Sequence, residues 1–238
     1  MPDTVISIFS GAFRECENLT DVKTSSSLIT IAFAAFSSCK SLTNINLSIS
    51  SLEIIDDFAF KGCENLKTVN FGKNVTLIGD NAFENCVSLE EAILPKNLYE
   101  IGHYAFMNCS SIKKIWIPKA LERWGFYSFY GAKYVSEIVF EDGLKQIGGI
   151  SNVFCYDAKI QILRIPASVE QISEGAFWDC KNLKEIYFEG AAPQIGTGEG
   201  KSNVFVTPEQ DVKIYYDPSM SGWDTTPLRD IYTLIPLS

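Results

Sequence analysis

The chain has a single histidine, no long apolar run and few basic residues. One histidine, His103, in 238 residues leaves little material for a zinc site or for histidine-based catalysis. No apolar run approaches the roughly 20 residues that span a bilayer, so we expect no membrane insertion. No charged-then-apolar leader opens the sequence, since Asp3 follows Met1 almost at once, although a trimmed leader would leave no trace.

The charge balance limits the classes of partner. The 20 Lys and Arg residues are outnumbered by 29 Asp and Glu, which gives a formal net charge of −9. This charge argues against non-specific binding to nucleic acid and against docking on anionic lipid. Apolar residues make up 46% of the chain, which is enough to form a core.

A unit of about 23 residues recurs along the sequence. In most units an aromatic residue follows alanine, a cysteine comes three positions later, and aliphatic residues come six, nine and eleven positions later. A unit of this size cannot bury its own apolar face, so the units must stack into a solenoid with one continuous core. The aromatic residues are Phe13, Phe36, Phe60, Phe83, Phe106, Phe129, Phe154 and Phe177.

The cysteines belong to the repeat. Ala132 takes the cysteine slot in one unit, so the slot demands a small buried side chain and no obligate bond. Disulfides between neighbouring units are disfavoured because their Cβ vectors run parallel, and one ligand per unit does not make a tetrahedral metal site. Cys155 lies out of register and is either a reactive or an idle thiol. The columnar cysteines, which we expect to be buried, are Cys16, Cys39, Cys63, Cys86, Cys109 and Cys180.

Each unit is predicted to contain a strand, an extended return and a short helical turn. The alternation of Ile115 and Ile117 about Trp116 indicates a strand. The three-residue spacing of Phe83 and Cys86 predicts a helical turn, with Asp80 as its N-cap. His103 takes the slot of Asp80 in the next unit and is interpreted as a turn residue. The fold class is therefore an α/β solenoid whose parallel, in-register strands form a curved sheet.

The stretch NAFENCVSLEEAILPKNLYEIGHYAF, residues 81–106, resembles the BspA-like leucine-rich repeat, also called the Treponema pallidum type. The resemblance covers roughly residues 5–190. It implies a right-handed leucine-rich-repeat superhelix with a concave parallel sheet. It also implies an extracellular or cell-surface location and a role in adhesion or protein binding, with no catalytic residues and no cofactor. The free cysteines alone would favour a reducing compartment slightly.

The repeat weakens at both ends. The first unit is incomplete, and the rhythm fails after Phe188. The segment GTGEGKS, residues 196–202, lacks the first glycine of a P-loop because Ile195 stands there, so it is interpreted as a flexible insertion. We predict one domain, with a solenoid over residues 1–190 and a cap over residues 191–238, in which aromatic residues cover the last unit.

A candidate binding surface lies on the outward positions of the later strands. Contiguous exposed apolar residues with a polar rim often mark an interface, and Trp, Tyr and Arg are favoured anchors. The opposing interpretation is that these residues only favour strands and pack against one another. The candidate partner-binding residues are Glu91, Ile93, Lys114, Trp116, Glu137, Val139, Arg164 and Tyr187.

These patterns favour a non-enzymatic interaction module whose partner is a protein or a glycan. The alternatives are a structural spacer in a larger surface protein and a glycan-binding module. An enzyme is disfavoured, since serines and acidic residues are spread evenly and no D-x-D-x-D-G calcium loop is present. No catalytic residue, cofactor or metal ligand is assigned, and the sequence does not indicate the oligomeric state.

Overall fold

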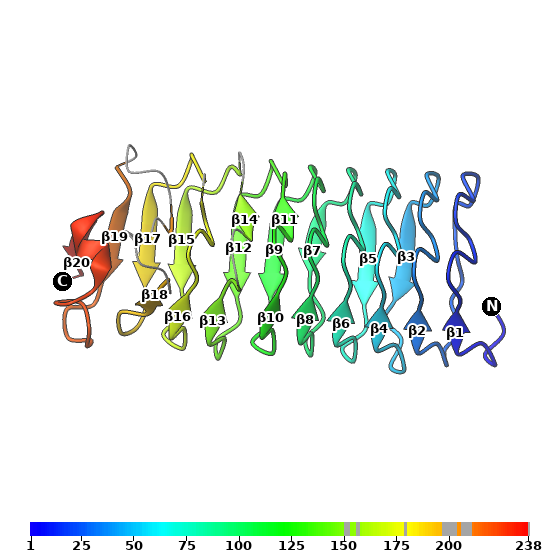
Figure 1. Ribbon diagram of the computed structural model, residues 1–238, viewed down its shortest axis with the longest axis horizontal. Helices are drawn as coiled ribbons and strands as arrows, with labels where there is room; N and C mark the ends of the chain where they lie inside the picture. The colour runs from blue at the N-terminus through cyan, green and yellow to red at the C-terminus, as the bar shows by residue number, and fades with distance from the viewer. Residues whose placement is uncertain (150–152, 156–157, 179, 197–203, 206–210, 238) are drawn as a thin grey trace.

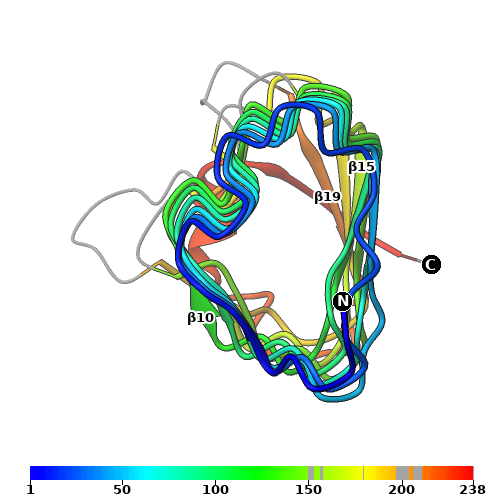
Figure 2. The same cartoon turned by 90° about the vertical axis from the view of Figure 1, so that its right-hand side faces the viewer.

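The protein is an elongated solenoid with its termini at opposite ends of the stack of coils (Figure 1). The computed structural model describes residues 1–149, 153–155, 158–178, 180–196, 204–205 and 211–237, without the side chain of Cys155. Along the long axis, the coils of the N-terminal half nearly superpose and the later ones are displaced (Figure 2). Most of the segment GTGEGKS and the interpretation placed on Cys155 lie outside the described residues.

The longer strands form a parallel surface that we call the broad sheet. Within each of three groups its strands pair in register with the neighbouring coils, as predicted, but the predicted pairing of all successive coils fails at two junctions. The pairing forms three groups, β3-β5, β7-β9-β12 and β15-β17-β19-β20, with unpaired junctions between β5 and β7 and between β12 and β15. The strands are β3 (Asn44–Leu47), β5 (Thr68–Phe71), β7 (Glu91–Ile93), β9 (Lys114–Ile117), β12 (Glu137–Phe140), β15 (Ile162–Ile165), β17 (Glu185–Phe188), β19 (Lys213–Tyr216) and β20 (Thr233–Pro236).

Two-residue strands form a second parallel surface, the narrow sheet. It joins β1, β2, β4, β6, β8 and β10 in one group and β13, β16 and β18 in another. The bounds of the first group are β1 (Ser7–Ile8), β2 (Thr30–Ile31), β4 (Ile54–Ile55), β6 (Leu77–Ile78), β8 (Glu100–Ile101) and β10 (Arg123–Trp124). The remaining elements are β13 (Gln146–Ile147), β16 (Gln171–Ile172), β18 (Gln194–Ile195), the pair β11 (Phe129–Tyr130) and β14 (Phe154–Cys155), and the 3₁₀ helix η1 (Pro227–Asp230).

The predicted helical turns, and with them the α/β class, are wrong. Within the described ranges the only helical element is η1, in the tail. In the coil of Phe83, the amides of Glu84 and Cys86 donate three residues back, but every second amide donates to the next coil. Those inter-coil pairs are Asn81–His103, Phe83–Ala105 and Asn85–Met107, at N···O distances of 2.8, 2.7 and 2.8 Å.

The reversal of direction needed for this zigzag comes from residues with positive φ. Asn81 and Asn85 have φ of 56° and 60°, on either side of Phe83. Asparagine tolerates this left-handed region better than most residues. Two tight turns thus place Phe83 and Cys86 on the interior side, as a helical turn would. The fold is a parallel β-solenoid.

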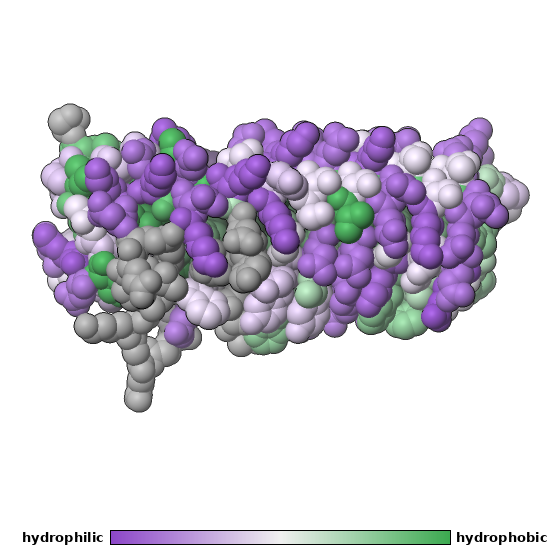
Figure 3. All heavy atoms as spheres, turned by 90° about the horizontal axis from the view of Figure 1, so that it is seen from above, coloured by the Kyte–Doolittle hydropathy of each residue, from purple (hydrophilic) through white to green (hydrophobic). Residues whose placement is uncertain are grey.

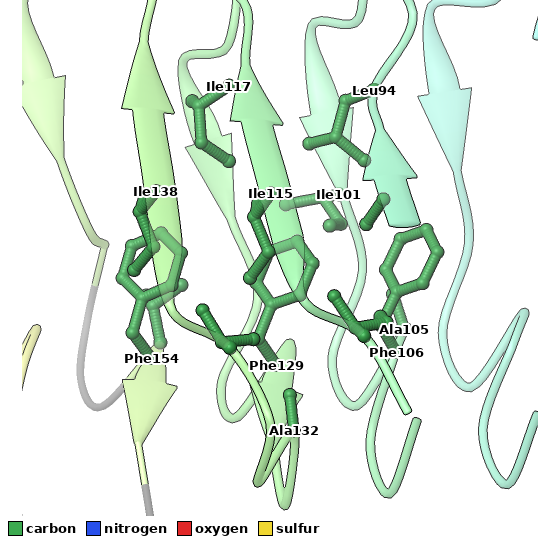
Figure 4. Close-up of a cluster of buried hydrophobic side chains, with 14 of the residues drawn as sticks. Leu94, Ile101, Ala105, Phe106, Ile115, Ile117, Phe129, Ala132, Ile138 and Phe154 are labelled. Atoms are coloured by element: carbon green, nitrogen blue, oxygen red, sulfur yellow. The ribbon is translucent and has the colours of Figure 1, made fainter. Parts of the chain in front are cut away.

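The aromatic residues of the repeat form one continuous stack. From Phe13 to Phe177 each ring is parallel to the next, and Phe205 extends the stack. Centroid distances run from 5.0 to 5.6 Å and interplanar angles from 4° to 16°. Figure 4 shows Phe106, Phe129 and Phe154 in this row, with Ile115 and Ile138 of the broad sheet pointing toward them. The core is therefore a set of columns parallel to the solenoid axis.

The columnar cysteines pack inside and also donate hydrogen bonds. The Sγ of Cys86 lies 3.2 Å from the carbonyl of Phe60 in the preceding coil, and Cys109 repeats this contact with Phe83 at 3.1 Å. The sulfur therefore satisfies a backbone acceptor, which the sequence analysis missed. Burial was predicted for six thiols. It is confirmed for five and wrong for Cys16, which is exposed in the first coil.

A polar ladder fixes the turn that follows the narrow sheet. Oδ1 of Asp57 accepts from the amide of Asp80 at 2.7 Å, and Oδ1 of Asp80 accepts from the amide of His103 at 2.6 Å. Nδ1 of His103 then accepts from the amide of Phe126 at 2.8 Å. His103 is thus a turn residue, as predicted, but Asp80 bridges two coils and caps no helix. A Cβ on Gly102 would lie 2.5 Å from the amide nitrogen of Asp80, so the close approach requires glycine.

The tail continues the stack beyond the point where the sequence rhythm fails. β18 pairs with β16, β19 with β17, and β20 with β19, all in parallel. Trp223 is buried, its Nε1 donates to the carbonyl of Gly190, and its ring lies 5.0 Å from that of Phe188. This aromatic cover fits a cap, while the division of the domain at residue 190 stays a prediction.

Candidate interaction surface

Six of the eight predicted residues form one patch on β7, β9 and β12. Two rows cross these strands in register: Glu91, Lys114 and Glu137, and Ile93, Trp116 and Val139. Alternation within each strand turns these side chains outward, while Ala92, Ile115 and Ile138 point into the core. The structure thus brings the six together, and we call them the central patch.

Trp116 is half-buried at the centre of this patch. Its register neighbours are Ile93, which is 42% exposed, and Val139, which is half-buried. Side chains in an in-register parallel ladder pack against both neighbours at the strand spacing of about 4.8 Å. The side chain of Trp116 therefore lies between two aliphatic neighbours in its row.

The two remaining predicted residues form a second cluster on β15 and β17. The guanidinium of Arg164 lies 4.6 Å from the ring centroid of Tyr187. Tyr187 Oη donates to Glu185 Oε2 at 2.9 Å, and this bond together with burial raises the pKa of the Tyr187 phenol. Because β12 and β15 are unpaired, this cluster lies across a junction from the central patch.

Tyr215 also belongs to this second cluster, whereas sequence reasoning assigned it to the cap and not to the binding surface. Its ring stacks on that of Tyr187 at 4.6 Å and 8°, because β19 pairs in register with β17. The signal was the alternation in K-I-Y-Y, which matches E-I-Y-F of the preceding strand. It was overlooked because the distance from the preceding unit is longer than the repeat.

Charged side chains border the patch. Lys114 Nζ lies 2.9 Å from Glu137 Oε1, in a pair that is largely exposed to solvent. Such pairs contribute about 0–1 kcal/mol, so this one orients the two side chains more than it stabilises the fold. Glu91 occupies the same row on the other side of Lys114.

Each unpaired junction of the broad sheet carries a groove. The larger, of about 570 Å³, lies at the β5–β7 junction, and Ile93 and Trp116 of the central patch line it together with Lys67, Lys73 and Lys96. The second, of about 410 Å³, lies at the β12–β15 junction and includes Glu137, Val139 and Arg164. The central patch is therefore bounded on both sides by grooves.

The residues with catalytic potential are engaged elsewhere. Nδ1 of His103 accepts a backbone hydrogen bond, and its ring stacks on Phe126 at 4.7 Å. Burial raises the pKa of the Cys39 thiol to about 11 and raises that of Cys86 strongly, which disfavours the nucleophilic thiolate. Among the described residues, no group of three or more His, Cys, Asp or Glu side chains could hold a metal ion.

Exposed apolar side chains also occur outside the broad sheet, Phe9 and Phe33 among them. On the side that Figure 3 shows, polar side chains follow the coils as ridges, and the apolar spots between them are small. In the part of the chain that the structure describes, no helix has the length and apolar character needed to cross a membrane.

Comparison with known proteins identifies a repeat family and a fold. The sequence model of the BspA type leucine rich repeat region matches residues 1–113 and 99–199, with six copies. A leucine-rich repeat protein of T. pallidum is 23% identical with a TM-score of 0.53, and the match covers 82% of this chain and 74% of that one. At this identity the likeness concerns the fold alone.

Two further solved structures are more distant. A leucine-rich repeat protein from Bacteroides ovatus is 20% identical with a TM-score of 0.46, over 89% of this chain and 63% of that one. A leucine rich cell surface protein from Faecalibacterium prausnitzii is 18% identical with a TM-score of 0.41, over 99% and 82%. None of the curated proteins matches the chain.

Proposed function

Because the chain belongs to the BspA-type leucine-rich-repeat family, we propose that it is a non-enzymatic module that binds a protein partner on its broad sheet. The central patch is the contact surface. One observation carries the proposal: Ile93, Trp116 and Val139 form an outward apolar row in exact register, although the core needs only the inward residues of the same strands. An exposed apolar row with a charged rim is the usual composition of a protein interface.

The geometry favours a protein over a glycan. Sugar rings bind aromatic residues through the open faces of the rings. Here Trp116 lies between Ile93 and Val139 in its row, and Tyr187 lies between Arg164 and Tyr215. Edges and hydroxyl groups therefore remain for contact, which suits the mixed surface of a protein. A glycan-binding module is the less favoured alternative, and a structural spacer would need no outward row at all.

We place the module outside the cell or on its surface, as the resemblance to BspA-like proteins implies, with adhesion as the form of binding. The buried thiols are compatible with that setting. Each lies in the core and donates to a backbone carbonyl, so oxidants reach it only after the coils separate.

The proposal is tested with Trp116→Ala and with Ile93→Ser, which remove the centre and one flank of the row. An array of purified extracellular proteins identifies a binder, and its affinity is then measured against each variant by biolayer interferometry. We expect a loss of at least about tenfold, because central aromatic anchors dominate interface energies. Thermal unfolding should shift by only a few degrees.

A matched control is Tyr99→Ala, which removes an exposed aromatic side chain outside the central patch. It should leave the affinity unchanged. If a partner binds the wild type and Trp116→Ala with equal affinity, the central patch is not the binding surface. If only a glycan binds, the glycan-binding alternative is favoured.

A further inference from the structure

The groove at the β5–β7 junction has a basic end. Lys73 and Lys96 occupy equivalent positions in consecutive coils, two residues after the end of β5 and three after the end of β7, and both are exposed and line the groove. Lys119 repeats the position one coil further. The ion pairs that the structure describes involve none of these three lysines. The row therefore places positive side chains at the same end of consecutive coils.

Acidic side chains are concentrated elsewhere in the groove. Glu90 and Glu91 line it near Lys67, at the end where β5 and β7 begin. Glu141 is not among the residues that line this groove, and its Oε2 accepts from the backbone amide of Lys119. The end of the groove formed by Lys73 and Lys96 is therefore positive, in a chain whose net charge is −9.

The wall of the same groove is apolar and continues the central patch. Ile93 and Trp116 form this wall, and Val69, Phe71 and Leu94 line the groove beside them. The strands flanking the groove are three to four residues long, which corresponds to about 10–14 Å of extended chain. A groove of this length fits a short extended segment with apolar and charged side chains in alternation.

We propose that this groove binds an extended acidic peptide segment of the protein partner. Carboxylates of the segment meet Lys73 and Lys96, and its apolar side chains meet Ile93 and Trp116. The inference rests on the proposed function, since it specifies the partner chemistry for the same surface. A densely sulfated glycan fits less well, because it has no apolar side chains to meet the wall that Ile93 and Trp116 form.

The test uses a fluorescein-labelled peptide of alternating glutamate and leucine, followed by fluorescence anisotropy against the intact protein. The double variant Lys73→Glu/Lys96→Glu should weaken binding by at least about tenfold, and raising the salt from 50 to 500 mM should weaken it in the wild type. The matched control Lys133→Glu/Lys184→Glu changes the net charge by the same amount, from −9 to −13, at residues that do not line the groove. It should retain the wild-type affinity within about twofold.

Several outcomes would overturn the inference. These are equal binding to both double variants, equal binding of a lysine–leucine peptide, no binding at millimolar peptide, and tighter binding of a sulfated oligosaccharide than of the acidic peptide. Circular dichroism of both double variants verifies that they fold. If the acidic peptide fails while an identified protein still depends on Trp116, the peptide assignment is wrong and the proposed function stands. If Trp116 is dispensable as well, both fail.

Discussion

The aromatic stack predicts a strong dependence of stability on position. Phe83 is fully buried, lies 5.1 Å from Phe60 and 5.0 Å from Phe106 in parallel stacks, and meets Phe71 edge-on at 5.7 Å. Replacing it by alanine leaves a cavity between two coils that are held by the backbone ladder. We expect Phe83→Ala to cost about 3–5 kcal/mol, the usual range for a buried Phe→Ala change.

Phe13 provides the comparison, because it has the same chemistry at the first coil. It is only half-buried, and Phe36 is its stacking neighbour at 5.1 Å. Less complete burial and one stacking neighbour in place of two predict a smaller cost, about 1–2 kcal/mol for Phe13→Ala. The variant Phe83→Leu keeps most of the apolar volume, so its smaller cost of about 1–2 kcal/mol measures the contribution of ring shape and stacking.

The assay is urea unfolding followed by circular dichroism and by tryptophan fluorescence. At about 2–4 °C per kcal/mol for a chain of this size, Phe83→Ala should also lower the melting temperature by roughly 6–20 °C. Solenoids can unfold coil by coil, so coincidence of the two probes must be established before free energies are compared. Equal losses at Phe13 and Phe83, or a loss below about 1 kcal/mol at Phe83, would refute the view that stacked columns hold the coils together.

Three further predictions follow from single positions. Ser38 has φ of 61°, so Ser38→Gly should stabilise the fold by about 0.5–1 kcal/mol in urea unfolding, whereas Asn85→Gly should be near neutral because asparagine tolerates this region. Burial and the neighbouring carboxylates raise the pKa of Asp57, so the neutral form of this side chain favours folding. That contribution to stability is lost as pH rises through the folded pKa. Asp57→Asn should therefore stabilise the fold by about 0.5 kcal/mol at pH 7 and have no effect at pH 3. In a Cys155→Ala background, Cys16 alone should react quickly with a thiol reagent at pH 8, and rapid labelling of Cys39 would contradict the packing.

The repeat spacing predicted most of the architecture because it acts through register. A constant spacing of 23 residues brings Ile93 beside Trp116 and Phe83 beside Phe106 without knowledge of the path between them. The inward columns and the outward rows therefore followed from counting alone. The same logic missed Tyr215, since a longer unit hides its register although the strand pairing is retained.

The helical turns were predicted wrongly because spacing does not distinguish two backbone paths. A three-residue separation puts Phe83 and Cys86 on one side of a helical turn and equally on one side of two successive tight turns. The choice depends on left-handed residues, and the chain uses bulky ones there, such as Tyr104 with φ of 58° and Tyr127 with φ of 53°. Their side chains give no indication of a positive φ, because inter-coil hydrogen bonds enforce this backbone conformation.

The grooves were also beyond the reach of the sequence. Both lie where neighbouring broad-sheet strands fail to pair, and one of these junctions, between β5 and β7, occurs at an ordinary repeat spacing. Strand pairing at this junction depends on small displacements between coils, which cannot be predicted from the repeat spacing. The residues of the central patch could be predicted from the sequence, but the grooves on both sides of the patch could not.

The ladder architecture separates the residues that hold the fold from those that could bind. Inward side chains such as Ile115 stack in columns, and changing one disturbs the coils on both sides. Outward side chains such as Trp116 point away from the core, and the same position holds asparagine at Asn46 and Asn70 with the strand pairing retained. An apolar row at those outward positions is consequently not required by the fold. That independence makes its presence on three consecutive strands informative, and it makes Trp116→Ala a test of binding that leaves the stack intact.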